Sequence, residues 1–377
     1  MIVKMKEVAN TLENTFIQKW KKDNGKVVGY SCTFIPPEII HAAGLLPFRL
    51  RGTGITSLAI GDAYLSAVNC SVPKCMLQLA GQGSYKFLDG VVITNGCDSM
   101  RRLDDCWRKA SEDYPGTRPG YFMYFSTPHK TKDYAIDFFE TDLRDFIKSL
   151  EKHFEVSITD KNLRNSIKLY NEGRQLMQKL DDLRCRTKAP ITGEDAMAIL
   201  IGGQAIPRKQ FNSMLKEFLA DLEKAPSVLD GKKRLMLVGS ANDDVDFVRV
   251  IEESGAIVVA DSVCYGSRSY GSLVDDKDDP VKAIASHYLK SSICPRMYGF
   301  YKDRRAYLRD IIKKARVDGV ILQNVRFCDL HGSENGVLER DFEAEGIPCM
   351  RLEKEYGPLV ETGRVRMRVD AFLERIS

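Results

Sequence analysis

The chain has 377 residues, of which 44% are hydrophobic and 29% charged, and this composition is typical of a globular protein with two or three domains. Lys and Arg number 56 against 52 Asp and Glu, so the formal charge of +4 argues against nucleic acid as a partner. No apolar run reaches the roughly 18 residues of a membrane span, and the charged first residues do not resemble a signal peptide. We therefore expect a cytoplasmic protein whose ten cysteines are buried thiols, metal ligands or redox groups.

The first third of the chain alternates predicted strands with predicted helices. A charged helical lead-in covers 1–27. The strand-like runs are 27–33, 47–50, 90–94 and 121–126, and the clearest helices between them are 37–43 and 72–80. Strands that alternate with helices indicate a parallel sheet. Residues 1–132 are therefore predicted to form an N-terminal α/β lobe.

The pattern changes after this lobe. Apolar residues recur at helical spacing in FFETDLRDFIKSLEKHF and LRNSIKLYNEGRQLMQKLDDLR, and Gly202 and Gly203 interrupt a third helix. We assign 133–228 to a helical linker domain. Strand-like runs then return as RLMLVGS, AIVVADS, GVILQ and CMRLE, which predict a C-terminal α/β lobe over 229–377.

The two α/β lobes resemble each other in sequence. LDGVVITNGCD at 88–98 and VDGVILQNVRFCD at 317–329 both give Asp-Gly, an apolar strand, a short loop and Cys-Asp. VVGYSCTFIPPEIIHAAGLLP also matches LMLVGSANDDVDFVRVIEESGAIV in its order of strand, polar loop, helix and glycine. These matches predict an internal duplication, with two Rossmann-like parallel-sheet lobes facing each other across a cleft that would hold a ligand.

Six of the ten cysteines lie at strand ends or helix starts, where open α/β sheets gather their binding groups. They are Cys32, Cys70, Cys97, Cys264, Cys294 and Cys328. A buried structural thiol is the alternative for any one of them, but six at equivalent positions indicate metal ligands. The other four are Cys106, Cys185 and Cys349, which we expect to be structural, and Cys75, which the sequence leaves open.

The spacing of these cysteines constrains the metal. Zinc sites usually show close Cys-x₂-Cys pairs, and neither these nor paired ligands among the five histidines occur. Dispersed thiolates favour an iron–sulfur cluster held from both lobes, although the ferredoxin spacing is absent. The chain also lacks a P-loop and a dinucleotide fingerprint, so we expect neither flavin nor NAD, and any ATP chemistry belongs to a partner.

The run GYSCTFIPPEIIHAAGLLPFRL resembles the N-terminal signature of the 2-hydroxyacyl-CoA dehydratase / benzoyl-CoA reductase family. The segments NCSVPKCMLQLAGQGSYKFLDGVVITNGCDSMRR, VVADSVCYGSRSY, ICPRM, DGVILQNVRFCD and EGIPCMRLE continue the resemblance in order over nearly the whole chain. It implies an iron–sulfur component that receives electrons from a separate ATP-hydrolysing activator with its own [4Fe-4S] cluster. The implied reactions are dehydration of a 2-hydroxyacyl-CoA or reduction of an aromatic acyl-CoA.

Two branches of this family differ in their ligand sets. In the dehydratase-type subunits three cysteines hold one [4Fe-4S] cluster, and those positions match Cys70, Cys97 and Cys328. The full set of six resembles instead the double-cubane branch, in which each subunit of a homodimer holds an [8Fe-9S] cluster and reduces small molecules such as acetylene. The Ser-Met-Arg-Arg that follows Cys97 and Asp98 is more similar to the reductase and dehydratase subunits.

Four hypotheses follow for the whole chain. It is an acyl-CoA reductase or dehydratase component, in a homodimer or in a heterodimer with a homologous subunit, or a double-cubane reductase of small molecules. A non-catalytic electron-transfer protein and a metal-free cysteine-rich scaffold are the other two.

Charged residues near the cysteines are candidates for further roles. Arg101, Arg102 and Arg268 could stabilise a reduced cluster or bind a CoA phosphate, or they could be solvated surface groups. Glu38 begins a helix shortly after Cys32, where it either stabilises the helix start or acts as an acid/base group. His41 would share its face, and His331 near Cys328 is a further candidate.

Overall fold

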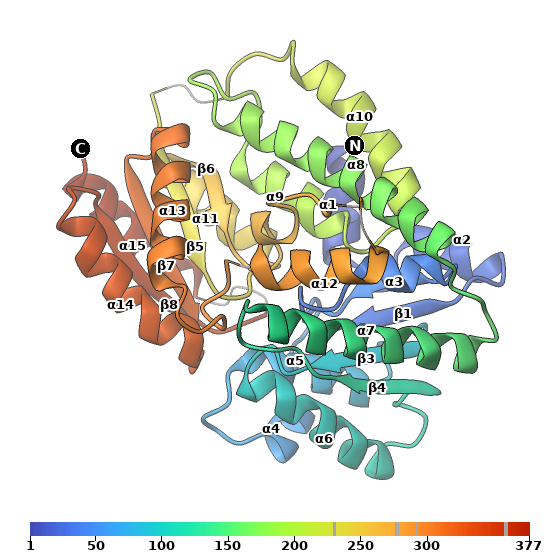
Figure 1. Ribbon diagram of the computed structural model, residues 1–377. Coiled ribbons are helices and arrows are strands. Elements are labelled where there is room, and N and C mark those ends of the chain that lie inside the picture. The colour runs from blue at the N-terminus through green and yellow to red at the C-terminus, as the bar shows by residue number, and fades with distance from the viewer. Residues whose placement is uncertain (229–230, 276, 278, 292, 358–360) are drawn as a thin grey trace.

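The computed structural model describes residues 1–228, 231–275, 277, 279–291, 293–357 and 361–377. Two four-stranded parallel sheets, one in each lobe, are covered by helices (Figure 1). The first sheet contains β1 (Val27–Tyr30), β2 (Leu46–Arg49), β3 (Gly90–Thr94) and β4 (Tyr121–Phe125). The second contains β5 (Lys233–Gly239), β6 (Ala256–Ser262), β7 (Gly319–Val325) and β8 (Cys349–Lys354). The predicted α/β class with two parallel-sheet lobes is confirmed.

The two sheets have the same strand order. The first runs β2-β1-β3-β4 and the second β6-β5-β7-β8, so each strand has a counterpart in the other lobe. This correspondence is what an internal duplication produces. In both sheets the order reverses beside the first strand, between β1 and β3 and between β5 and β7, and ligands of open α/β sheets usually bind at that point.

The strands form because short, nearly continuous apolar runs fit a parallel sheet that is covered on both faces. All the residues of β1, β3 and β6 are buried. Helices α3 (Pro37–Ala42), α5 (Ser71–Gly81) and α6 (Asp98–Asp113) connect the strands of the first sheet, and the short α4 (Ala59–Tyr64) precedes α5. Helices α1 (Ile2–Asn10) and α2 (Thr15–Lys22) form the lead-in.

The middle of the chain is helical, as its periodicity predicts. It contains α7 (Asp133–Phe154), α8 (Asp160–Arg184), α9 (Gly193–Gly202) and α10 (Arg208–Leu222). The turn after α9 begins at Gly203, where a Cβ would lie 2.5 Å from the Phe211 ring. Helix α9 is apolar on nearly every side because it packs between α1 and α11.

The remaining helices belong to the C-terminal part of the chain. They are α11 (Val245–Glu253), α12 (Pro280–Lys290), α13 (Tyr301–Ala315), α14 (Asp329–Glu343) and α15 (Thr362–Arg375). Helix α12 leaves its own lobe and lies along α7 (Figure 1). Its Ile284 and Leu289 share an apolar core with Ile39 of α3 and Val92 of β3. This crossing brings the loop after α12 to the first sheet.

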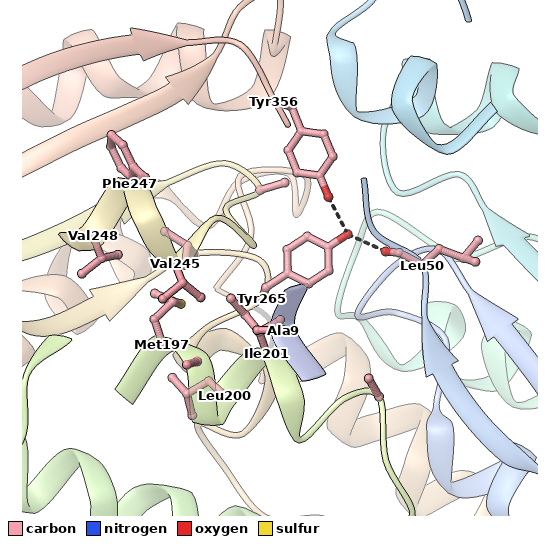
Figure 2. Close-up of a cluster of buried hydrophobic side chains, with 14 of the residues drawn as sticks. Ala9, Leu50, Met197, Leu200, Ile201, Val245, Phe247, Val248, Tyr265 and Tyr356 are labelled. Atoms are coloured by element: carbon pink, nitrogen blue, oxygen red, sulfur yellow. Dashed lines mark hydrogen bonds between the residues drawn. The ribbon is translucent and has the colours of Figure 1, made fainter. Parts of the chain in front are cut away.

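A hydrogen-bonded pair of tyrosines joins the lobes within the main core (Figure 2). The Tyr265 hydroxyl donates to the carbonyl oxygen of Leu50 at 2.6 Å. The Tyr356 hydroxyl in turn donates to the Tyr265 hydroxyl at 3.5 Å. The backbone N–H of Gly52 donates to the Tyr356 hydroxyl at 2.9 Å. Among the described residues, no helix is both long enough and apolar enough to cross a membrane.

Candidate functional site

Three of the predicted ligands occupy the same local position, the residue that precedes a helix. Cys70 caps α5, Cys97 caps α6 and Cys328 caps α14, and we call these three the capping cysteines. The sulfur of Cys97 accepts a hydrogen bond from the backbone N–H of Met100 at 3.4 Å. Free N–H groups and the helix dipole favour a negative charge there, so this position suits a thiolate.

The other two capping cysteines have similar surroundings. Cys70 and Cys328 also stand at the N-terminus of a helix, although neither sulfur accepts a hydrogen bond from the first turn of that helix. Phe327, just before Cys328, has a φ of 62°, which is rare for an aromatic residue. Backbone strain of this kind occurs where the fold must orient a particular side chain, and the side chain that follows Phe327 is that of Cys328.

The other three predicted ligands lie in loops, and we call them the loop cysteines. Cys32 follows β1, Cys264 follows β6, and Cys294 lies between α12 and α13. Cys264 accepts a hydrogen bond from the Arg268 side chain at 3.5 Å.

The capping and loop cysteines gather in one place. A Cβ on Gly96 would lie 2.8 Å from the Cys32 sulfur, so the loop before α6 rests directly on Cys32. Cys97 interacts electrostatically with the other two capping cysteines and with Cys32. Cys294 interacts with the other two loop cysteines, and Cys328 interacts with two loop cysteines. Thiols from both lobes therefore form a single connected group beside the points where the strand order reverses.

Burial is the largest influence on the pKa of the Cys97, Cys294 and Cys328 thiols. It raises the pKa of Cys328 to about 12 and that of Cys294 to about 11, and it holds the pKa of Cys97 well above its ordinary value. In the metal-free chain these three sulfurs are therefore protonated at neutral pH. Because metals bind the thiolate, metal loading must release protons from the site.

The donor set fits an iron–sulfur cluster better than a single ion. Across the described ranges, no three Cys, His, Asp or Glu side chains converge closely enough to hold one metal ion. The thiolates of a cluster bind different irons, so ligands spread over neighbouring loops are compatible with a cluster. Soft sulfur donors with N–H and guanidinium neighbours also match that chemistry.

The direction of the hydrogen bonds separates the remaining cysteines from this group. The thiols of Cys75, Cys106 and Cys349 donate to the carbonyl oxygens of Tyr356, Tyr64 and Ile347. A thiol that donates must carry its proton, whereas the sulfurs of Cys97 and Cys264 accept. Cys75, which the sequence leaves open, groups with the structural thiols by this criterion, although it lies near Cys70.

The structure divides the three arginines that the sequence singled out. Arg101 and Arg102 are about half exposed, with side-chain exposures of 48% and 52%, and both pair with Asp98 on the surface of α6. These contacts match the surface alternative. Arg268 lies in the site, where it donates to Cys264, to the carbonyl oxygen of Gly239 and to Nε2 of His331. His331 Nε2 therefore accepts, which makes this histidine neutral, and burial holds its pKa well below its ordinary value.

Glu38 is fully buried and bonded to two other helices. Its Oε1 accepts from Arg174 at 2.5 Å and its Oε2 from the Tyr288 hydroxyl at 2.8 Å. Burial alone would raise the pKa of Glu38, but Arg174 and Tyr288 outweigh it and lower the pKa. These contacts favour a structural role: Glu38 ties α3, which follows Cys32, to α12, which precedes Cys294.

His41 belongs to the same packing. Its Nδ1 lies 3.0 Å from the Ser166 hydroxyl, which itself donates to the carbonyl oxygen of Glu38 at 2.8 Å. His41 Nδ1 must therefore carry the proton. Burial lowers the pKa of His41, and its ring packs edge-on against Tyr170.

Sequence reasoning missed two arginines in the site, Arg49 and Arg296. Both are almost fully buried, with exposures of 4% and 3%. Arg296 donates to the backbone oxygens of Asn95 and Pro128 at 2.9 and 2.7 Å, so it fastens the loop of Cys294 to the first lobe. Its only sequence signal is its place two residues after Cys294.

The cavities next to the site are small and polar. One of about 30 Å³ is lined by Tyr30, Thr33 and Arg49 among others, and one of about 40 Å³ by Thr33 and Arg268 among others. They have room for a few water molecules, far less than the several hundred Å³ of a usual ligand pocket. Larger cavities of about 580 and 670 Å³ lie beside α12 and beside β8, and none of the six cysteines lines them.

Comparison with known proteins places the chain in a family. A family model described as 2-hydroxyglutaryl-CoA dehydratase, D-component, matches residues 32–376. A benzoyl-CoA reductase subunit from Thauera aromatica is 29% identical over 87% of this chain and 86% of its own length. The (R)-phenyllactyl-CoA dehydratase beta subunit of Clostridium sporogenes is 25% identical over 96% of this chain and 95% of its own length.

The beta subunit of (R)-2-hydroxyglutaryl-CoA dehydratase from Acidaminococcus fermentans is 22% identical, again over 96% of this chain and 95% of its own length. These relatives are named as subunits of reductases or dehydratases, and the family match begins at Cys32 and covers every candidate ligand. The chain therefore belongs to the family of the 2-hydroxyglutaryl-CoA dehydratase D-component.

Proposed function

We propose that this chain is the iron–sulfur component of an enzyme that reduces or dehydrates an acyl-CoA thioester. The observation that carries the proposal is the gathering of six cysteines from both lobes into one connected group. Family membership and the names of the relatives point to the same class of substrate. A partner subunit is part of the proposal, either a second copy or a homologous chain.

Within this proposal the protein's own groups hold and shield the cofactor. When bound, the cluster would supply low-potential electrons, which a separate ATP-hydrolysing iron–sulfur activator delivers. The capping cysteines anchor it at three helix starts, and backbone N–H groups stabilise the thiolates. The cavities beside Cys32 are too small for an acyl-CoA. Substrate must therefore enter by an opening of the loops or through a surface shared with the partner.

One observation favours a second candidate, a double-cubane reductase of small molecules. The loop cysteines lie in electrostatic contact with the capping cysteines, so six thiolates are available where a single cubane uses fewer. Small substrates such as acetylene would also fit the small cavities better than a thioester.

An activator-dependent assay tests the proposal. Anaerobically purified protein, with its activator and ATP, is supplied either with a panel of 2-hydroxyacyl- and aromatic acyl-CoA thioesters or with acetylene. Conversion of a thioester supports the first candidate, and conversion of acetylene alone supports the second. If neither is converted although the protein carries iron, the enzymatic proposal fails and a pure electron-transfer role is left.

A further inference from the structure

Three arginines in the site, Arg49, Arg268 and Arg296, have no carboxylate partner within ion-pair distance in the described parts of the chain. Of the other buried arginines, Arg174 and Arg184 pair with carboxylates. Arg51 and Arg234, which lie away from the six cysteines, donate to backbone carbonyl oxygens instead. Arg49 and Arg296 are buried and Arg268 is half-buried. Unpaired charges in such positions are costly, so three of them beside the cysteines favour an anion at the site.

The first of these, Arg268, touches a loop cysteine directly. Its Nη2 lies 3.5 Å from the Cys264 sulfur, and its electrostatic partners include Cys294. Asp261 also faces this guanidinium, but it is already paired with Arg184 at 3.0 Å.

The second, Arg49, stands at the end of β2 between two loop cysteines. Its Nη1 donates to the Thr33 hydroxyl at 3.3 Å, and that hydroxyl approaches the carbonyl oxygen of Cys264 at 3.5 Å. Its Nε is buried without a hydrogen-bond partner. Its electrostatic partners besides tyrosines are Cys32 and Cys264.

The third, Arg296, completes the arrangement. It packs 4.7 Å from the centre of the Phe34 ring, two residues beyond Cys32, and its electrostatic partners include Cys32 and Cys294. The guanidinium of Arg296 donates to oxygens of Asn95, Thr127 and Pro128, none of which is a carboxylate. Each arginine therefore flanks a different pair of the three loop cysteines.

We propose that Arg49, Arg268 and Arg296 form a cationic triangle that stabilises the reduced state of a cluster on the side held by the loop cysteines. The proposal rests on the proposed iron–sulfur function. One-electron reduction adds one negative charge beside three fixed positive charges and transfers no proton. The electron comes from a one-electron protein donor such as the activator, or from dithionite in the laboratory. The three arginines influence the reaction only through the charge that they place beside the cluster, so they are positioning residues and not catalytic ones.

The capping cysteines stand at the N-termini of α5, α6 and α14, where the helix dipoles also act on them. Arg268 and Arg296 reach Cys328 and Cys97 as well, but no arginine of the triangle has Cys70 among its principal electrostatic partners. A helix end supplies about half a unit charge, whereas each guanidinium supplies a full one. The more cationic side accepts added charge more readily. Electrons therefore settle first on the side of the loop cysteines.

The test compares Arg49→Gln, Arg49→Lys and Arg268→Gln with the wild type. Each protein is purified anaerobically, its iron is quantified, and its cluster is titrated with dithionite under spectroscopic observation. We expect both glutamine variants to keep iron but to show about a tenfold lower equilibrium constant for reduction, a shift of about 59 mV for a one-electron couple. Arg49→Lys keeps the charge and should titrate close to the wild type.

Arg234→Gln is the matched control, because Arg234 is also a buried arginine that donates to backbone carbonyl oxygens but lies away from the six cysteines. It should leave the titration unchanged. Loss of iron in Arg49→Gln that Arg49→Lys restores would also support the triangle. Wild-type potentials in both iron-loaded glutamine variants would overturn the triangle and leave the proposed function standing, whereas a wild type without iron would overturn both.

Discussion

At the scale of the residue, hydrogen-bond direction is what distinguishes the cysteines. Sulfurs such as those of Cys97 and Cys264 accept from N–H groups, whereas those of Cys106 and Cys349 donate to carbonyl oxygens. An accepting sulfur is prepared to become a thiolate, and a thiolate is the form that binds metal. This distinction leads to predictions for single cysteines.

Substitution of Cys294 by alanine should lower the iron content of anaerobically purified protein, because it removes a thiolate from the connected group. The matched control is Cys185→Ala, since Cys185 is a buried thiol packed in the core of the second sheet. It should leave iron unchanged at some cost in stability. Equal iron in the two variants would refute the ligand assignment.

Glu38→Gln should lower the free energy of unfolding by about 3–5 kcal/mol at pH 7, because it leaves the buried Arg174 charge without its partner. Urea denaturation measures the change. Asp145→Asn is the control, since Asp145 forms an exposed pair with Lys148 and should change stability by less than about 0.5 kcal/mol. A small effect at Glu38 would mean that the pair does not tie α3 to α12.

The same pair has a defined pH dependence. The pKa of Glu38 is lower in the folded chain than in the unfolded one, so the pair stabilises the protein above the ordinary glutamate pKa of about 4.3. This contribution is lost as the pH falls through the folded pKa. The stability difference between wild type and Glu38→Gln should therefore shrink below about pH 4. A constant difference down to the acid limit of folding would contradict the assignment.

At the scale of elements, the site depends on how closely two loops approach. Gly96 has no room for a side chain, because its Cβ would lie 2.8 Å from the Cys32 sulfur. Cys97 lies between β3 and α6, and Cys328 lies between β7 and α14. Strands β3 and β7 occupy equivalent places in the two sheets. The duplication thus builds the site from repeated strand–cysteine–helix units.

Gly96→Ala should reduce iron content, because the added methyl group pushes the loop of Cys97 away from Cys32. Gly332→Ala in α14 is the control, since nothing lies within 4 Å of its Cβ position. The control should keep its iron and gain up to about 1 kcal/mol in stability from better helix propensity. Iron equal to wild type in Gly96→Ala would show that the two loops need not touch.

The sequence was most informative where local patterns decide the structure. The buried strands and helices α3 and α5 were predictable from apolar runs and helix-start signals. Helix α4 was missed because it is only six residues long, contains Gly61 and has no side-chain cap. The six cysteines could be selected from their positions at strand and helix ends. Their mutual contact depends on how the two lobes dock, which no local pattern encodes.

The roles of the charged residues were the least predictable. Arg296 donates a hydrogen bond to Asn95, which is 201 positions away in the sequence, and Glu38 accepts one from Tyr288, which is 250 positions away. Arg101 and Arg102 stand close in sequence to Cys97, yet the turn of α6 exposes them on the surface. Proximity in sequence to a ligand therefore predicted proximity in space for Arg268 but not for Arg101 and Arg102.

At the scale of the whole molecule, the two lobes and the helices between them share one core, and α12 crosses from the second lobe to the first. Tyr265 is buried at this junction and reaches the first lobe through Leu50. The relative placement of the lobes sets the distances between the cysteines, so the junction and the site are coupled.

Tyr265→Phe should destabilise the protein by about 1–3 kcal/mol, because it leaves the buried carbonyl oxygen of Leu50 without its donor. Thermal or urea unfolding measures the loss. Tyr134→Phe is the control, since Tyr134 is 66% exposed and should behave as wild type. No difference between the two variants would mean that the hydroxyl does not help to hold the lobes together.

The central claim is that one iron–sulfur centre is held jointly by cysteines of both lobes. It is tested most directly by iron and sulfide analysis of freshly purified anaerobic protein, alongside Cys70→Ala from the first lobe and Cys328→Ala from the second. We predict about eight iron atoms per chain for a double cubane or about four for a single one, and a loss of iron in both variants. A wild type without iron, or a variant of either lobe that keeps the full content, would contradict the account.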